Sequence, residues 1–242
     1  MLYLLFLLLL LTRLSKSSEL DTIVVATSDE SQNDQLQSVV ESLGYQCTRG
    51  SEKEVLGRFY ESANTVNADV IVRITGDCPL VDPVLVDECI EGFKQFQVDY
   101  FSNINPATFP DGLDIEVMSF DSIERANEET NSEFDREHVT PYMWDNPKIF
   151  KLKNFSYLSR KKKYHNRIRL TLDYIEDYCL IYQIYQSLYK KNRFFNIRDV
   201  LRLLDKKKEL SKINRKYIKV NWYRHHLKKL KTIKNSATST NI

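Results

Sequence analysis

Short apolar runs alternate with longer stretches of helical spacing through the first hundred residues. The runs at residues 22–27, 45–48, 70–74 and 99–103 have the length and the β-branched or aromatic content of buried strands. Between them, residues 34–43, 54–64 and 83–96 carry apolar side chains at the three- and four-residue spacing of amphipathic helices. This alternation predicts an α/β fold in which a mostly parallel sheet is flanked by helices.

The second half of the chain continues with fewer strands. A turn at residues 109–112 precedes a predicted strand at 113–117 and a helix at 120–129, and a further helical segment begins at Arg136. Residues 167–172 read as a strand, and the chain from Asp177 onward reads mainly as helices. We therefore expect one α/β domain over residues 1–205, with a helical C-terminal part, and a basic helical extension and tail over residues 206–242.

The first eleven residues, MLYLLFLLLLL, are uninterruptedly apolar. This run is well short of the ~20 residues that a membrane-spanning helix needs. A secretory signal would place basic residues before the run and a small-x-small cleavage site after it, whereas here Arg13 and Lys16 follow it. We expect a buried core helix from residue 1 to about residue 15, and no membrane span.

Composition narrows the class of protein further. The chain has 242 residues, of which 42% are hydrophobic, which is enough to form a core. Between residues 206 and 234, twelve Lys or Arg residues accompany one acid, and a solvated basic end is the favoured interpretation over a nucleic-acid surface. The four scattered cysteines form neither a zinc pattern nor a disulfide framework, which favours a reduced, cytoplasmic protein.

Two acids follow predicted strands at comparable places. Asp77 comes after the strand at 70–74, and Asp173 comes after the strand at 167–172. Ligands of open α/β sheets bind beyond the carboxyl ends of the strands, and Mg²⁺ there takes one or two carboxylates with water and phosphate oxygens. Gly, Asp and Pro are also ordinary turn residues, so a plain turn at 76–79 is the alternative. We expect the two carboxylates to lie close enough to share one Mg²⁺.

Four longer motifs occur in order: ADVIVRITGDCPLVDP, FPDGLDIEVMSFDSIERA, REHVTPYMWDNP and RLTLDYIEDY. Together with LDTIVVATS and RGSEKEVLGRFY, they resemble the spore coat polysaccharide cytidylyltransferase family. That family is related to the cytidylyltransferases that activate acidic sugars with CTP. The resemblance covers about residues 12 to 205.

The resemblance implies a Rossmann-like, nucleotide-diphospho-sugar transferase fold. It also implies a Mg²⁺-dependent reaction in which a sugar hydroxyl attacks the α-phosphate of CTP, giving a CMP-sugar for surface polysaccharide synthesis. CTP and an acidic sugar are the implied partners, and a homodimer is left open. By match to the motifs, Asp77 and Asp173 are the implied catalytic and metal-binding residues. The implied nucleotide-binding residues are Ser28, Gly50, Ser51, Thr75 and Gly76, and the implied sugar-binding residues are Asp114, Glu116, Arg136, Glu137 and His138.

The chain departs from the family at its start. Members of the family open with a strand and a loop containing Gly, Ser, Arg and Lys that wraps the triphosphate. None of the six glycines of this chain lies upstream of Thr22. The expectation is therefore that the first strand and the phosphate loop are absent, so that the chain is a fragment or a degenerate copy that binds CTP poorly.

Two other functions stay open from the sequence. A nucleotide-sugar-dependent glycosyltransferase shares this sheet, but it usually carries an Asp-x-Asp pair, and here Cys78 and Pro79 follow Asp77. A non-catalytic interaction protein is the other alternative.

The predicted sugar-side residues also have simpler interpretations. His138 would orient the start of a helix, Arg136 would pair with Glu133 or Glu137, and Glu116 would face solvent on an edge strand.

Overall fold

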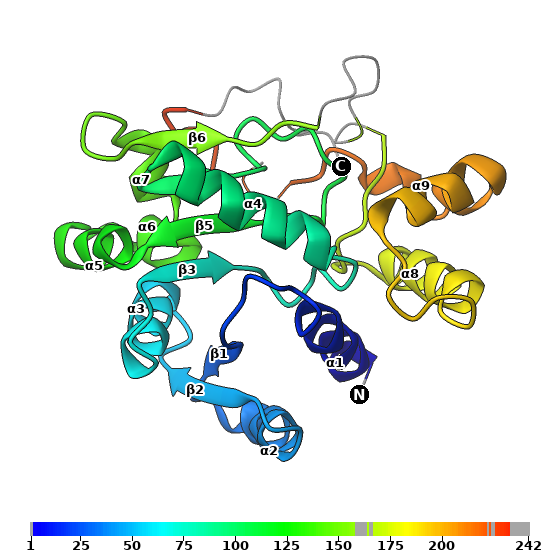
Figure 1. The fold of residues 1–242 in the computed structure, drawn as a ribbon, viewed down its shortest axis with the longest axis horizontal. Helices are drawn as coiled ribbons and strands as arrows, with labels where there is room; N and C mark the ends of the chain where they lie inside the picture. Colours follow the sequence, from blue (N-terminus) through cyan, green and yellow to red (C-terminus); the bar gives the residue numbers. More distant parts are fainter. Residues whose placement is uncertain (1, 158–163, 165–166, 222, 224–225, 233–242) are drawn as a thin grey trace.

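The computed structural model describes residues 2–157, 164, 167–221, 223 and 226–232 (Figure 1). In it, the helices and strands follow one another along the chain much as the apolar pattern predicts. The helices of four residues or more are α1 (Leu2–Leu14), α2 (Asp34–Ser42), α3 (Val55–Thr65), α4 (Pro83–Phe96), α5 (Phe120–Glu129), α6 (Glu133–His138), α7 (Pro141–Asp145), α8 (Ile175–Leu188) and α9 (Ile197–Lys206). The strands are β1 (Val24–Ser28), β2 (Gln46–Gly50), β3 (Val70–Arg73), β4 (Tyr100–Ser102), β5 (Glu116–Ser119) and β6 (Leu152–Asn154).

The strands form two sheets, and the larger one is mixed. β1 and β2 pair in parallel with each other, and four strands form the second sheet in the order β3-β5-β4-β6. β5 runs antiparallel to both of its neighbours, whereas β4 and β6 are parallel. The expectation of a mostly parallel sheet is therefore wrong, although the α/β class is confirmed.

The direction of β5 follows from the connection that precedes it. Parallel neighbours need a crossover, usually through a helix, whereas a chain that turns straight back pairs antiparallel. Residues 103–115 contain no helix, and Asn103 braces the loop by donating to the Leu113 carbonyl at 2.7 Å and accepting from the Ile115 amide at 2.9 Å. The returning strand, β5, therefore pairs antiparallel with β4, and its other edge pairs with β3.

Alternation along the strands divides the core between the two faces of this sheet. Val117 and Phe101 belong to one buried cluster, which also takes in α1, α4, α8 and α9. Met118 and Tyr100, one position away on the same strands, belong to a second cluster with α3, α5, α6 and α7. Side chains of a strand point alternately to opposite faces, so this pattern is what a sheet covered on both sides requires.

The leucine-rich start of the chain is a packed helix. In α1, Phe6, Leu10 and Leu14 are buried in the first cluster. Arg13 is also buried, and it donates to the carbonyls of Val81 and Phe195 at 3.0 and 2.9 Å, which ties α1 to the turns before α4 and α9. The prediction of a core helix is confirmed. No helix in the described part of the chain combines the length and apolar character that crossing a membrane would take.

The predicted strand at residues 167–172 is wrong. There, Arg169 makes only an isolated bridge with Asp111, and the Leu170 amide donates to the Asp111 carbonyl at 2.6 Å. The segment packs against the turn at Gly112 instead of pairing with a strand along its length. Gly112 has a φ of +92°, and a Cβ placed on it would lie 2.2 Å from the Thr171 nitrogen. Only glycine allows so close an approach.

Gly112→Ala is expected to lower the free energy of unfolding by about 3 kcal/mol, since a left-handed φ and a collision with backbone both oppose the new methyl group. Gly44→Ala is the matched control, because Gly44 has a φ of +84° but no atom within 4 Å of the added Cβ. It should lose only about 1 kcal/mol. Urea unfolding of both variants gives the comparison, and equal losses would mean that the close approach at Gly112 is unimportant.

Candidate functional site

A cavity of about 480 Å³ lies at the end of β3, between the turn that follows it, the loop before β5, and the segment before α8. Most of its lining residues have polar or charged side chains. Its lining residues are Arg73, Thr75, Asp77, Cys78, Ile104, Asp111, Asp114, Glu116, His138, Thr140, Trp144, Arg169, Thr171, Asp173, Tyr174, Val220 and Asn221.

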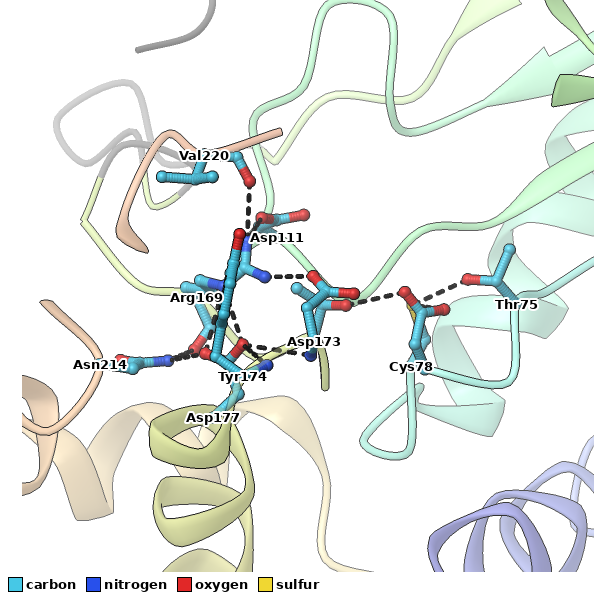
Figure 2. Close-up of polar contacts among 11 residues, drawn as sticks. Thr75, Cys78, Asp111, Arg169, Asp173, Tyr174, Asp177, Asn214 and Val220 are labelled. Atoms are coloured by element: carbon cyan, nitrogen blue, oxygen red, sulfur yellow. Dashed lines mark hydrogen bonds and ion pairs between the residues drawn. The ribbon is translucent and has the colours of Figure 1, made fainter. Parts of the chain in front are cut away.

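Arg169 organises one wall of this cavity (Figure 2). Its guanidinium is 2% exposed and contacts three carboxylates. Nη1 lies 3.0 Å from Asp111, Nε lies 3.1 Å from Asp177, and Nη2 is paired with Asp173. Nη1 also donates to the Val220 carbonyl at 2.9 Å. A planar guanidinium can bind several oxygens in fixed directions, so Arg169 holds segments far apart in the sequence in one arrangement.

The C-terminal segment supports the same wall. The Asn214 side chain donates to the Arg169 carbonyl at 2.9 Å and to Asp177 at 2.7 Å. Tyr217 stacks on Tyr174 with ring centroids 3.7 Å apart. Residues 214–221, which the sequence assigns to a basic extension, therefore form part of the surroundings of the cavity.

Asp77 is held against the same wall. Thr171 Oγ1 donates to Asp77 Oδ2 at 2.9 Å, and Asp173 lies two residues further along. The turn that carries Asp77 is closed by the Cys78 amide, which donates to the Thr75 carbonyl at 3.1 Å. Both carboxylates thus line one cavity. The two segments that carry them are far apart in the sequence, since Thr171 and Asp77 are separated by 94 positions.

Burial raises the pKa values of three acids of the cavity, and the negative charges of neighbouring acids add to the rise. Burial raises the pKa of Asp111 to about 7, and the negative charges of Asp173 and Asp77 add to the rise. The positive charge of Arg169 opposes it. Burial also raises the pKa of Asp114 well above its usual range, with Asp111 and Asp77 contributing. The pKa of Asp173 is raised by burial, with Arg169 opposing. A bound cation would relieve this crowding of negative charge.

The cavity offers the small number of protein carboxylates that a Mg²⁺ ion requires. Mg²⁺ is held by one or two carboxylates, several waters and substrate phosphates, and seldom by a cage of protein ligands. Asp77 and Asp173 supply the two carboxylates at a cavity wall. Within residues 2–232, masked positions aside, no three His, Cys, Asp or Glu side chains gather into a site that would hold a metal unaided.

Glu116 anchors the opposite wall. It is 1% exposed, pairs with Arg73, and accepts from the Tyr100 hydroxyl at 2.6 Å. Trp144 Nε1 donates to the same hydroxyl at 2.9 Å. The interpretation of Glu116 as a solvent-facing residue on an edge strand is wrong, because β5 lies between β3 and β4.

His138 lies at the end of α6, not at the start of a helix as its simpler interpretation has it. Its ring packs edge-on against Phe134 at 4.6 Å and lies 5.3 Å from His226. Burial lowers the pKa of His138 to about 4, with His226 and Arg73 adding to the effect. At neutral pH this imidazole is uncharged, so it can offer hydrogen bonds but no charge.

Arg136 pairs with Glu54, the N-cap residue of α3, so the expected pairing with Glu133 or Glu137 is wrong. It also donates to the carbonyls of Asn127 and Thr130 at 3.2 and 3.0 Å. These contacts make Arg136 a link between α3, α5 and α6.

The structure brings some of the predicted site residues together and leaves others outside the cavity. Those that line it are Thr75, Asp77, Asp114, Glu116, His138 and Asp173. Those that do not are Ser28, Gly50, Ser51, Gly76, Arg136 and Glu137. Ser28 and Gly50 are paired at the carboxyl ends of β1 and β2, where Gly50 belongs to the strand and not to a turn. Their roles in nucleotide binding stay predictions.

Among the charged residues that line the cavity, the sequence does not single out three: Arg73, Asp111 and Arg169. Each lies inside a motif that was recognised as a whole. An arginine within an apolar run is the one available signal, since a buried guanidinium needs acidic partners. Both Arg73 and Arg169 have that pattern.

The chain is similar to known proteins in sequence and in fold. Residues 6–219 match the family model described as Cytidylyltransferase. The chain is 40% identical over 211 residues to an uncharacterized protein of Methanocaldococcus jannaschii, with 85% of this chain and 82% of that protein covered. It is 33% identical over 169 residues to the spore coat polysaccharide biosynthesis protein SpsF of Bacillus subtilis, with 69% and 68% covered. A solved cytidylyltransferase structure from Leptospira borgpetersenii superposes with a TM-score of 0.78 at 29% identity, covering 85% of this chain and 84% of that one.

Arg169→Gln is expected to destabilise the protein by about 3–5 kcal/mol, because three carboxylates lose the charge that compensates them. Arg125→Gln removes an exposed arginine paired with Glu129 and should cost less than about 1 kcal/mol. Denaturant unfolding at pH 7 measures both. A small loss at Arg169 would mean that the carboxylates find other compensation.

His138 should make stability depend on pH. Its pKa is near 6.5 when unfolded and about 4 when folded, so its contribution is present above pH 6.5 and is lost as the pH falls toward 4. As the pH falls through that window, the free energy of unfolding of the wild-type protein should decrease more steeply than that of His138→Gln, by up to about 1 kcal/mol per pH unit. Unfolding curves at pH 7, 6 and 5 test this, and parallel losses in both proteins would contradict it.

Proposed function

The chain belongs to the cytidylyltransferase family, and we propose that it transfers the cytidylyl group of CTP to a sugar hydroxyl, with release of pyrophosphate. The observation that carries the proposal is the meeting of Asp77 and Asp173 at one cavity. The sugar oxygen forms a new bond to the α-phosphorus, the bond from that phosphorus to the bridging oxygen breaks, and the hydroxyl proton leaves to a base or to water. Such a reaction depends on position and on charge stabilisation.

Asp77 and Asp173 would hold Mg²⁺ in this proposal. The ion, when bound, neutralises charge on the reacting phosphates and on the leaving pyrophosphate. Thr171 fixes the orientation of Asp77 through its hydrogen bond, and Arg169 holds Asp173. These neighbours restrict both carboxylates before the nucleotide arrives, which reduces the ordering cost of binding.

The acceptor sugar would lie against Asp114, Glu116 and His138. Asp114 makes no hydrogen bond or ion pair with any described residue, so its carboxyl group is available to a sugar hydroxyl. Arg73, fixed by Glu116, is the cation that would face the carboxylate of an acidic sugar. The name of the Bacillus subtilis relative supports a role in making surface polysaccharide.

The direct test is pyrophosphate release from CTP with a panel of acidic, neutral and amino sugars, with and without Mg²⁺. Asp77→Asn and Asp173→Asn should each lower kcat/KM by at least about a hundredfold, because each removes a metal ligand. Asp205→Asn removes an exposed carboxylate on α9 and serves as the control with unchanged activity.

Two results would contradict the proposal. One is activity that survives chelation of Mg²⁺ and both substitutions at the cavity. The other is the absence of pyrophosphate release with every sugar tried, in which case the family fold would be serving another purpose in this chain.

A further inference from the structure

Arg58 differs from the other arginines that are at least partly buried. Within the described part of the chain, the side chain of Arg58 makes no hydrogen bond and no ion pair. Its Nε is buried without a partner, as Arg13 Nη1 and Arg73 Nε also are. All the others in this class are bonded to protein groups: Arg13, Arg49, Arg73, Arg136 and Arg169. A partly desolvated guanidinium without an acceptor is costly, so its retention points to a ligand that supplies one.

The protein makes room for Arg58 at Gly50. A Cβ added to Gly50 would lie 2.9 Å from Arg58 Cγ, closer than such atoms approach in real structures. This γ carbon is near the backbone of α3, so it cannot swing aside as the tip of a long side chain does. The glycine at the end of β2 therefore leaves the space that the side chain of Arg58 occupies.

Two contacts place this part of α3 beside the cavity. The ring of Phe59, the next residue, lies under the Arg73 guanidinium at 5.6 Å, and Arg73 lines the cavity. Glu54 at the start of α3 binds Arg136 of α6, the helix that ends with cavity-lining His138. The helix that carries Arg58 thus contacts residues around the cavity and, at Gly50, the carboxyl end of β2.

The nearby acids do not pair with Arg58. Asp29 and Glu52 are the charges that act on it most strongly, yet both are exposed and neither comes within ion-pair distance. Exposed carboxylates keep their hydration and gain little from such a pair. A phosphate group, which carries more charge and several acceptor oxygens, matches a guanidinium bidentately.

We propose that Arg58 binds a phosphate of the triphosphate tail of CTP, placed by the space that Gly50 leaves for it. This inference rests on the proposed function, since it takes CTP to be the substrate. It gives a reason for Gly50 in the nucleotide site, although Gly50 lies outside the cavity. Ligands of α/β sheets cross the carboxyl ends of several strands, so one nucleotide can extend from this arginine to Asp77.

The test uses the full chain and two probes: inorganic tripolyphosphate and CTP, each titrated calorimetrically with Mg²⁺ present. Arg58→Gln should weaken both about tenfold to a hundredfold, as expected for a lost charge-assisted contact. Arg58→Lys should fall between, because lysine keeps the charge but not the fork of donors. Arg125→Gln, with the same change of charge at an exposed pair, should bind as the wild type does.

Gly50→Ala is the second variant, and it leaves every charge in place. It should displace Arg58 and weaken tripolyphosphate binding in the same direction, whereas combining it with Arg58→Gln should add little further loss. Thermal unfolding separates binding from folding: Arg58→Gln should melt at or above the wild-type temperature, since the side chain has no protein partner to lose.

The outcomes separate this inference from the proposed function. Equal binding of tripolyphosphate by wild type and Arg58→Gln, or no binding by the wild type, overturns the role of Arg58. An unchanged KM for CTP in Arg58→Gln, with turnover intact, overturns it while leaving cytidylyl transfer standing. Arg58-dependent binding of tripolyphosphate without turnover of any sugar supports the phosphate site and counts against the enzyme.

Discussion

The arrangement of the cavity depends on one buried guanidinium. Arg169 is surrounded by three carboxylates, those of Asp111, Asp173 and Asp177, and by the backbone carbonyl of Val220. Burying a charge is unfavourable unless it is compensated, so each of these groups must be in place for the others to be tolerated. The turn at Gly112, the segment before α8 and the C-terminal segment are thereby held in one position.

Much of the fold could be predicted from periodicity because most elements have a clear apolar pattern. The helices α2, α3, α4 and α5 follow their predicted ranges to within a residue or two, since each presents one apolar stripe to a core. Pairing direction is not a local property, and so the antiparallel β5 was not predicted. The extended segment at 167–172 has the composition of a strand, but its neighbours in space offer it a single turn residue instead of a strand edge.

The site could be predicted in part, and for a related reason. Asp77 and Asp173 are recognisable because their motifs are local, and the structure places both at the cavity. Arg169 could not be singled out in the same way, since its partners are spread from residue 111 to residue 220. The lysine-rich composition of the C-terminal segment indicates a solvated end, whereas the groups that matter there are the amide of Asn214 and a main-chain oxygen. The composition of a segment averages over all its residues, so it cannot predict a role for two polar groups among many charged side chains.

The division of the strands between two sheets has a consequence for local opening. β1 and β2 bond to each other, and in the described residues neither shares a ladder with β3, β5, β4 or β6. A local opening of residues 24–50 would break no ladder of the larger sheet, so we expect the amide protons of β1 and β2 to exchange with solvent faster than those of β3, β5 and β4. Any molecule that contacts both sheets would join these two cooperative units, and slowed exchange in β1 and β2 would report its presence.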